Sequence, residues 1–118
     1  MITNRLFAPI LSMTLVASVV SLLLAPPVRA QQADATYSQN CTACHGDKGH
    51  GDGAAGKFLK PPPPDFATSL KGKTDDWIAK AIKGGGAAVG ESSTMPAYAN
   101  LSDDQIKGLV AYIKSLNP

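Results

Sequence analysis

Two cysteines and a histidine stand close together in Cys41-Thr42-Ala43-Cys44-His45, the C-x-x-C-H pattern by which haem c is attached to a protein. In a helix the two thiols lie one turn apart, and that spacing suits the two vinyl groups on adjacent pyrrole rings. The histidine that follows can offer an imidazole nitrogen to the iron. The pattern predicts one covalent haem c per chain, held by Cys41 and Cys44, with His45 as an axial ligand.

Three other chemistries use the same residue types. A disulfide between Cys41 and Cys44 suits an oxidising compartment, but it leaves His45 without a role. A thioredoxin-type redox site needs a strand that leads into the cysteine pair, and no strand is evident in the sequence. Zinc could use the three motif residues with His50, but Cys44 and His45 are adjacent and no hairpin separates two ligand pairs. We therefore favour haem c over these alternatives.

Met95 is the candidate for the second axial ligand. Met1 and Met13 lie in the N-terminal segment, so Met95 is the one methionine in the rest of the chain. It precedes Pro96 in an expected loop, where a methionine that only fills the core is the competing interpretation. His50 is the rival ligand, but a short glycine-rich loop would have to carry it round the haem, and a solvated histidine is the simpler expectation. Paired histidine and methionine ligands raise the reduction potential of a haem.

The N-terminal segment has the order of a secretory signal peptide. A basic start at Arg5 is followed by an uncharged stretch that ends at Val28, and Ala30 stands at a suitable cleavage position. We predict cleavage after Ala30, a mature domain of residues 31–118 and a periplasmic location. The uncharged stretch is also long enough to span a bilayer, so an uncleaved membrane anchor is the alternative.

The charge of the chain argues against one class of partner. The formal net charge is +2, and removal of residues 1–30 would also remove Arg5 and Arg29 and leave the charge balanced. This balance excludes a nucleic-acid-binding protein, which needs clustered Lys and Arg. Five lysines lie between Lys57 and Lys80. They are either a docking face for a redox partner or simply a solvated set of charges.

Three helices are predicted, and no segment has the alternation of a strand, so the fold class is all-α. The first helix is expected from Asp34, which can cap it, to about Cys44. The second begins after Thr74, which can also act as a cap, and the glycines from Gly84 end it. The third begins at Ser102, and its apolar stripe has helical spacing. That stripe consists of Ile106, Leu109, Val110, Ile113 and Leu116.

The start of the third helix and the loop after the first carry further signals. Ser102 and Gln105 form a capping box, and Leu101 before the cap can pack on the first turn. Residues 46–73 are rich in glycine and proline, and most of this stretch is predicted to be irregular. A long irregular loop in a small domain suits a chain that wraps a flat apolar cofactor.

These residues resemble the class I cytochrome c family over residues 34–118. Tyr37 stands where the family has an aromatic residue before the first cysteine, and Tyr112 is similar to the aromatic residue of its terminal helix. Family members often have Gly where the two helices cross, and Ala33 occupies that position here, so a looser contact is expected. The resemblance implies the cytochrome c fold, with short helices wrapped around one covalent haem and with histidine and methionine ligands.

The stretch from His45-Gly46 to Pro64-Asp65-Phe66 is similar to small bacterial periplasmic monohaem cytochromes. That resemblance implies that a carbonyl of the proline-rich loop, from Pro61 or Pro62, orients the axial histidine. Aromatic residues are the remaining candidates for the haem pocket, with ordinary core packing as the equal alternative. These are Trp77, Tyr98 and Phe58.

With both axial positions taken by protein, the expected function is one-electron transfer, with no catalytic residue and no enzyme activity of its own. The partners would be redox proteins that dock transiently at the haem edge, and the chain would be a monomer. Any contact with a membrane would come through a membrane-bound partner or an uncleaved anchor. One alternative is the electron-accepting subunit of a larger dehydrogenase or oxidase. Another is a gas-binding or peroxidase-like haem protein, if Met95 does not bind the iron.

Overall fold

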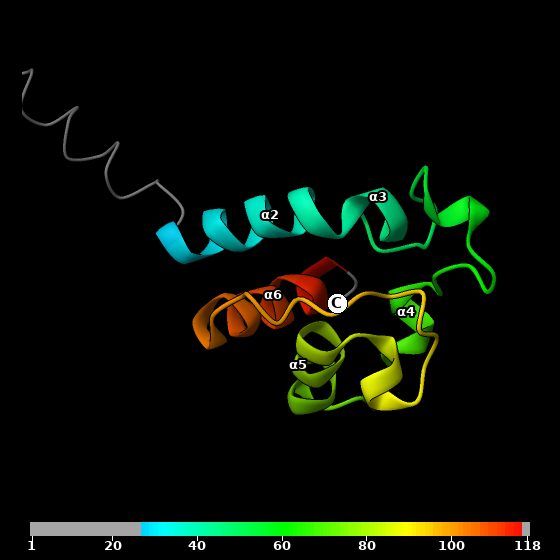
Figure 1. The fold of residues 1–118 in the computed structure, drawn as a ribbon. Coiled ribbons are helices and arrows are strands. Elements are labelled where there is room, and N and C mark those ends of the chain that lie inside the picture. Colours follow the sequence, from blue (N-terminus) through cyan, green and yellow to red (C-terminus); the bar gives the residue numbers. More distant parts are fainter. Residues whose placement is uncertain (1–26, 117–118) are drawn as a thin grey trace, which may run out of the picture.

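The computed structural model describes residues 27–116, and the signal peptide predicted for the N-terminus lies almost wholly outside them. The described chain contains helices and no strand, which confirms the all-α prediction (Figure 1). Within residues 27–116, no helix combines the length and apolar character that a membrane span requires. In chain order the elements are α2 (Val28–Asn40), α3 (Thr42–His45), η1 (Gly56–Phe58), α4 (Phe66–Ser69), α5 (Asp75–Gly84), η2 (Gly86–Val89) and α6 (Asp103–Leu116).

The first described helix begins earlier than the sequence predicts. α2 starts at Val28, directly after Pro27, instead of at Asp34. The prediction was wrong because the carboxylate of Asp34 does not cap a helix: it accepts a hydrogen bond from the Tyr112 hydroxyl of α6 at 2.8 Å. The early start also places the expected cleavage position, Ala30, inside the first turns of α2.

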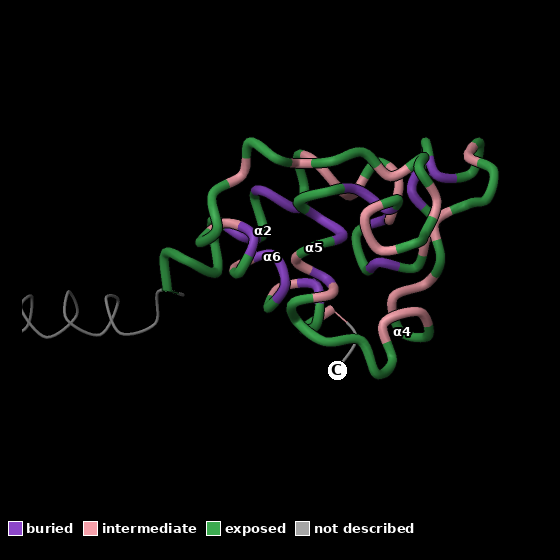
Figure 2. The backbone as a smooth tube through the Cα atoms, turned by 60° about the horizontal axis from the view of Figure 1, so that its bottom comes forward, coloured by how far each residue is buried: buried purple, intermediate pink, exposed green. Residues whose placement is uncertain are grey.

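The core lies where α2, α5 and α6 meet, and Figure 2 shows the buried stretches of these helices facing one another. The predicted stripe of α6 is buried up to Ile113, and Leu116 is half-buried at its end. Burial of such side chains is the main source of stability in a domain of this size. The buried cluster consists of Tyr37, Ile78, Ile82, Ile106, Leu109, Val110 and Ile113.

The crossing of α2 and α6 is close because a glycine stands on the side of α6. A Cβ atom added at Gly108 would lie 3.6 Å from the Cβ of Ala33. Because Gly108 has no side chain, the surface of α6 is flat opposite the buried Ala33 of α2. This flat surface compensates for the methyl group of Ala33, which we expected to loosen the contact. Tyr37 and Tyr112 add an aromatic contact, with ring centroids 5.3 Å apart.

Two of the three predicted helix caps are present, those of α5 and α6. The Thr74 hydroxyl accepts a hydrogen bond from Trp77 N at 3.2 Å and begins α5. At the start of α6, Gln105 N donates to Ser102 Oγ (3.2 Å) and Ser102 N donates to Gln105 Oε1 (2.9 Å), which is a complete capping box. Exposed ion pairs between α5 and α6 then join the two helices, Lys83 with Asp103 and Lys114 with Asp75.

Candidate haem site

The C-x-x-C-H motif lies where one helix ends and another begins. Cys41 interrupts α2 with φ −117° and ψ −37°, and the chain continues directly into the single turn of α3. His45 N donates to Cys41 O at 2.9 Å, so the motif forms one closed helical turn. Both thiols are free and half-buried. Burial, with a smaller contribution from Cys44, raises the pKa of the Cys41 thiol to about 11, so this thiol is protonated at neutral pH.

The alternatives to haem find no support in this geometry. The cysteines are not joined in a disulfide, and no strand precedes them in the described chain. Among residues 27–116, no three His, Cys, Asp or Glu side chains are grouped as a metal site requires. His50 lies away from the motif cysteines in a contact with Asp65, so it does not complete a zinc site with them.

The His45 residue is half-buried. Burial lowers its pKa, and a neutral imidazole is the form that binds a metal. Its Nδ1 atom is buried and has no hydrogen-bond partner among the described residues. The hydrogen bond that the family resemblance implied, to Pro61 or Pro62, is therefore not formed.

One residue of the site was not predicted. The ring of Phe66, at the start of α4, packs on the His45 imidazole with a centroid distance of 4.7 Å and an angle of 33° between the planes. The sequence does contain a signal for Phe66. An aromatic residue directly after a helix-capping residue, Asp65, follows the proline run and so stands at the start of a helix. The contact leaves the imidazole in a largely apolar setting.

Glycines let the loop after the motif lie against α3. A Cβ atom at Gly53 would be 2.4 Å from Ala43 O, and one at Gly56 would be 2.2 Å from Cys44 O. Only a residue without a side chain permits such an approach between two backbones. The glycine-rich loop was expected to wrap a cofactor, and in the structure it packs directly on the turn that carries the two cysteines.

The loop that carries Met95 is attached to α5 and to the end of α2. Met95 is half-buried, and its carbonyl accepts a hydrogen bond from Gly86 N at 3.1 Å. Three residues further on, Tyr98 N donates to Ile82 O at 3.0 Å. The Tyr98 hydroxyl then donates to Asn40 O at 2.7 Å, directly before Cys41. The fold therefore brings the methionine loop to the end of α2 where the motif begins.

The three aromatic residues considered for a pocket lie in different surroundings. Tyr98 is beside the motif: burial, followed by the proximity of Cys41 and Cys44, raises the pKa of its hydroxyl. Trp77 is half-buried, and the Lys73 ammonium lies 4.2 Å from its ring. Phe58 is 84% exposed, so it is not an ordinary core residue.

The donor set fits a covalently bound haem c. Two free thiols stand one helical turn apart, and a neutral imidazole with a buried, unpartnered nitrogen follows them. A helical fold with this motif at the end of its first described helix, and a methionine loop before its last helix, defines a c-type cytochrome.

The family can be named more closely. A family model described as cytochrome c oxidase, cbb3-type, subunit III, matches residues 28–113. This match spans the described chain except for Pro27 and residues 114–116. The chain belongs to this family of c-type cytochromes, and haem and electron transport are the family's properties.

Two curated relatives are named as the CcoP subunit of a cbb3-type cytochrome c oxidase. The protein from Azospirillum brasilense is 33% identical over 88 residues, which is 74% of this chain and 28% of the relative. The protein from Azospirillum sp. (strain B510) is 37% identical over 82 residues, which is 68% of this chain and 26% of the relative. The chain thus spans about a quarter of the length of these relatives.

Proposed function

We propose that this chain is a haem c electron-transfer subunit, or module, of a cbb3-type cytochrome c oxidase. It would hold one haem through thioether bonds from Cys41 and Cys44, with His45 and Met95 as the axial ligands. The observation that carries the proposal is the meeting of the C-x-x-C-H turn with the methionine loop, through the 2.7 Å hydrogen bond from Tyr98 to Asn40. The names of the two relatives support the oxidase over a free electron shuttle.

Bound haem would supply a centre that gains and loses one electron. The protein has three tasks around that centre. The two thiols would prevent its loss, and His45 would offer a neutral nitrogen, because burial lowers the pKa of its imidazole. The hydrogen bonds from Gly86 N to Met95 O and from Tyr98 N to Ile82 O would hold the Met95 loop in one position in both oxidation states. Ligands that stay in place keep reorganisation small, and an iron with both axial positions filled has no site for a substrate.

The partners would be other proteins of the oxidase, and the domain would work in the periplasm after export. The predicted signal peptide, with cleavage after Ala30, supports this location. Membership of an oxidase subunit family favours a lasting protein contact over the transient docking and the monomeric state that the sequence alone suggested. The enzyme would then be the complex, with this chain as its electron-transfer component.

The test is a spectrum of the exported protein in its oxidised and reduced forms. We expect pyridine haemochrome bands of haem c at one haem per chain, and the weak near-infrared band of ferric haem with a methionine ligand. The Met95→Ala variant should lose that band and bind carbon monoxide, because an axial position opens. The matched control is Leu59→Ala, which changes another half-buried loop side chain and should keep the band.

Three outcomes would contradict parts of the proposal. A protein without covalent haem would remove its basis. A haem protein with no near-infrared band would exclude Met95 and favour the gas-binding or peroxidase-like alternative. Affinity purification from membranes of cells that express the tagged chain should recover the catalytic oxidase subunit, and failure to recover it would return the free carrier to first place.

A free electron carrier is the second candidate, and one structural feature favours it. α6 has a complete capping box and packs on α2 and α5 within the same chain, so the helical core needs no other protein to close it. The purification experiment separates the two candidates, because a free carrier would be found in the soluble periplasmic fraction alone.

A further inference from the structure

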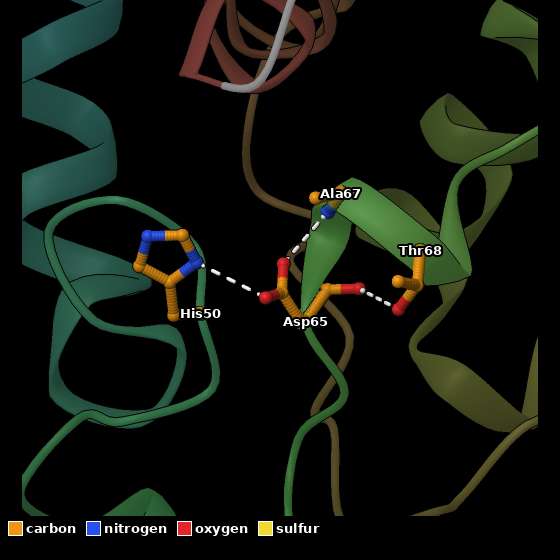
Figure 3. Close-up of polar contacts among 4 residues, drawn as sticks. All are labelled: His50, Asp65, Ala67 and Thr68. Carbon is orange, nitrogen blue, oxygen red and sulfur yellow. Dashed lines mark hydrogen bonds and ion pairs between the residues drawn. The ribbon is translucent and has the colours of Figure 1, made fainter.

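His50 and Asp65 form a contact between two loops that flank the proposed axial histidine (Figure 3). His50 Nδ1 donates to Asp65 Oδ2 at 3.1 Å, and both side chains are partly exposed. The second carboxylate oxygen, Oδ1, accepts from Ala67 N at 2.8 Å and caps α4. Asp65 thus uses one oxygen to begin α4 and the other to attach it to the loop that follows His45.

The residue after Asp65 carries this attachment to the site. Phe66 N donates to Gly49 O at 2.8 Å. A Cβ atom at Gly49 would lie 2.2 Å from the Phe66 ring, so the ring packs directly on that backbone. The centroid of the same ring lies 4.7 Å from the centroid of the His45 imidazole. Phe66 therefore contacts both the glycine loop and the proposed iron ligand.

The glycine loop itself is well anchored. Gly51 N donates to His45 O at 2.8 Å, and the Tyr37 hydroxyl donates to Gly46 O at 2.8 Å. By contrast, α4 is one turn long and is too short to be stable by itself. The contacts of Asp65 and Phe66 with this loop are what can hold the start of α4 in place.

We propose that His50 and Asp65 are positioning residues, which hold Phe66 against His45 and thereby raise the reduction potential of the bound haem. The inference rests on the proposed function, because it takes His45 as the axial ligand. A ring packed on the imidazole keeps water from it and from the unpartnered Nδ1 atom. Water at Nδ1 would make the imidazole a stronger donor and favour the oxidised state. A drier setting also disfavours the more highly charged oxidised state.

The test compares four variants of the haem-loaded protein. His50→Ala removes the donor, whereas His50→Asn places an amide nitrogen at the position of Nδ1 and should rescue the contact. Asp65→Ser keeps a helix-capping oxygen but is too short to reach His50. Thr68→Ala is the control, because it removes a hydrogen bond to Asp65 O in the same turn without touching His50 or Phe66.

Two measurements are made on each variant. In a redox titration, we expect His50→Ala and Asp65→Ser to lower the equilibrium constant for reduction by about tenfold, which is about 59 mV for one electron. In hydrogen exchange of the reduced protein, the Phe66 amide should exchange at least about tenfold faster in these two variants. His50→Asn and Thr68→Ala should stay close to the wild-type protein in both measurements. A fifth variant, the double substitution His50→Ala with Asp65→Ser, should shift no further than either single one, because the two residues act through one contact.

The outcomes separate this inference from the function on which it rests. If the wild-type protein carries haem with the near-infrared methionine band, but His50→Ala and Asp65→Ser leave the potential unchanged, only the inference is overturned. Equal shifts in the Thr68→Ala control would also overturn it, since the effect would then be a general loss of structure. If the wild-type protein binds no covalent haem, the proposed function fails and the inference fails with it.

Discussion

Gly108 offers a sharp test of the packing between α2 and α6. A methyl group placed there would meet the Cβ of Ala33 at 3.6 Å, which is an ordinary van der Waals distance. The residue lies in the middle of α6, where its backbone is helical. Gly108→Ala therefore adds a contact without a clash, even though the two helices are close.

The expected effect is stabilisation. Glycine inside a helix costs about 0.5–1 kcal/mol relative to alanine, because it loses more backbone entropy on folding. The new methyl group fits the crossing, so most of this difference should appear in the free energy of unfolding. For a domain of this size, about 1 kcal/mol corresponds to a rise in Tm of roughly 4–8 °C.

The assay is equilibrium urea unfolding of the haem-loaded protein, followed by circular dichroism at helix wavelengths. The matched control is Gly72→Ala, where a Cβ atom would meet no described atom within 4 Å. Gly72 has φ +73°, however, and an L side chain in this region costs about 1–2 kcal/mol. We expect Gly108→Ala to stabilise the fold and Gly72→Ala to destabilise it. Destabilisation by Gly108→Ala of more than about 1 kcal/mol would refute this account of the crossing.

Three further perturbations test the core, a cap and an ion pair. Leu109 is fully buried, so Leu109→Ala should lower the unfolding free energy by about 2–5 kcal/mol; a loss below about 1 kcal/mol in urea unfolding would place it outside the core. Ser102→Ala should cost about 1 kcal/mol by the same assay through loss of the α6 cap, and Ser115→Ala, at the other end of the helix, should cost less. The hydrogen bond from Lys83 lowers the pKa of Asp103, so its stabilisation should be present at neutral pH and disappear on acidification through that lowered pKa. Asp103→Asn should weaken the pH dependence of Tm below about pH 4, and an unchanged profile would show that the pair does not contribute.

The features that could be predicted from the sequence are those made by residues close together in the chain. The Thr74 cap and the Ser102–Gln105 capping box each join residues three apart, and both are present. The buried stripe of α6 follows from helical periodicity in the same way. The C-x-x-C-H motif is likewise a local pattern, and membership of the cbb3-type family agrees with the cytochrome class that it predicts.

The start of α2 could not be predicted in this way. Asp34 has the residue type of a cap, but its carboxylate bonds to Tyr112, which is 78 residues away in the chain. Contacts with α6 extend the helix back to Val28: Ala33 packs against Gly108, and Arg29 forms an exposed ion pair with Asp104. A local capping signal was therefore overridden by packing between the two ends of the domain.

The surroundings of the proposed iron ligand likewise depend on distant parts of the chain. The ring of Phe66 reaches His45 across a loop, and Tyr98 reaches Asn40 from the opposite half of the domain. The sequence by itself predicted the residues proposed to bind haem, because their spacing along one helical turn carries the chemistry. Only the tertiary structure decided which side chain packs on His45 and which side chain attaches the Met95 loop, because those contacts form when segments with no local relation pack together.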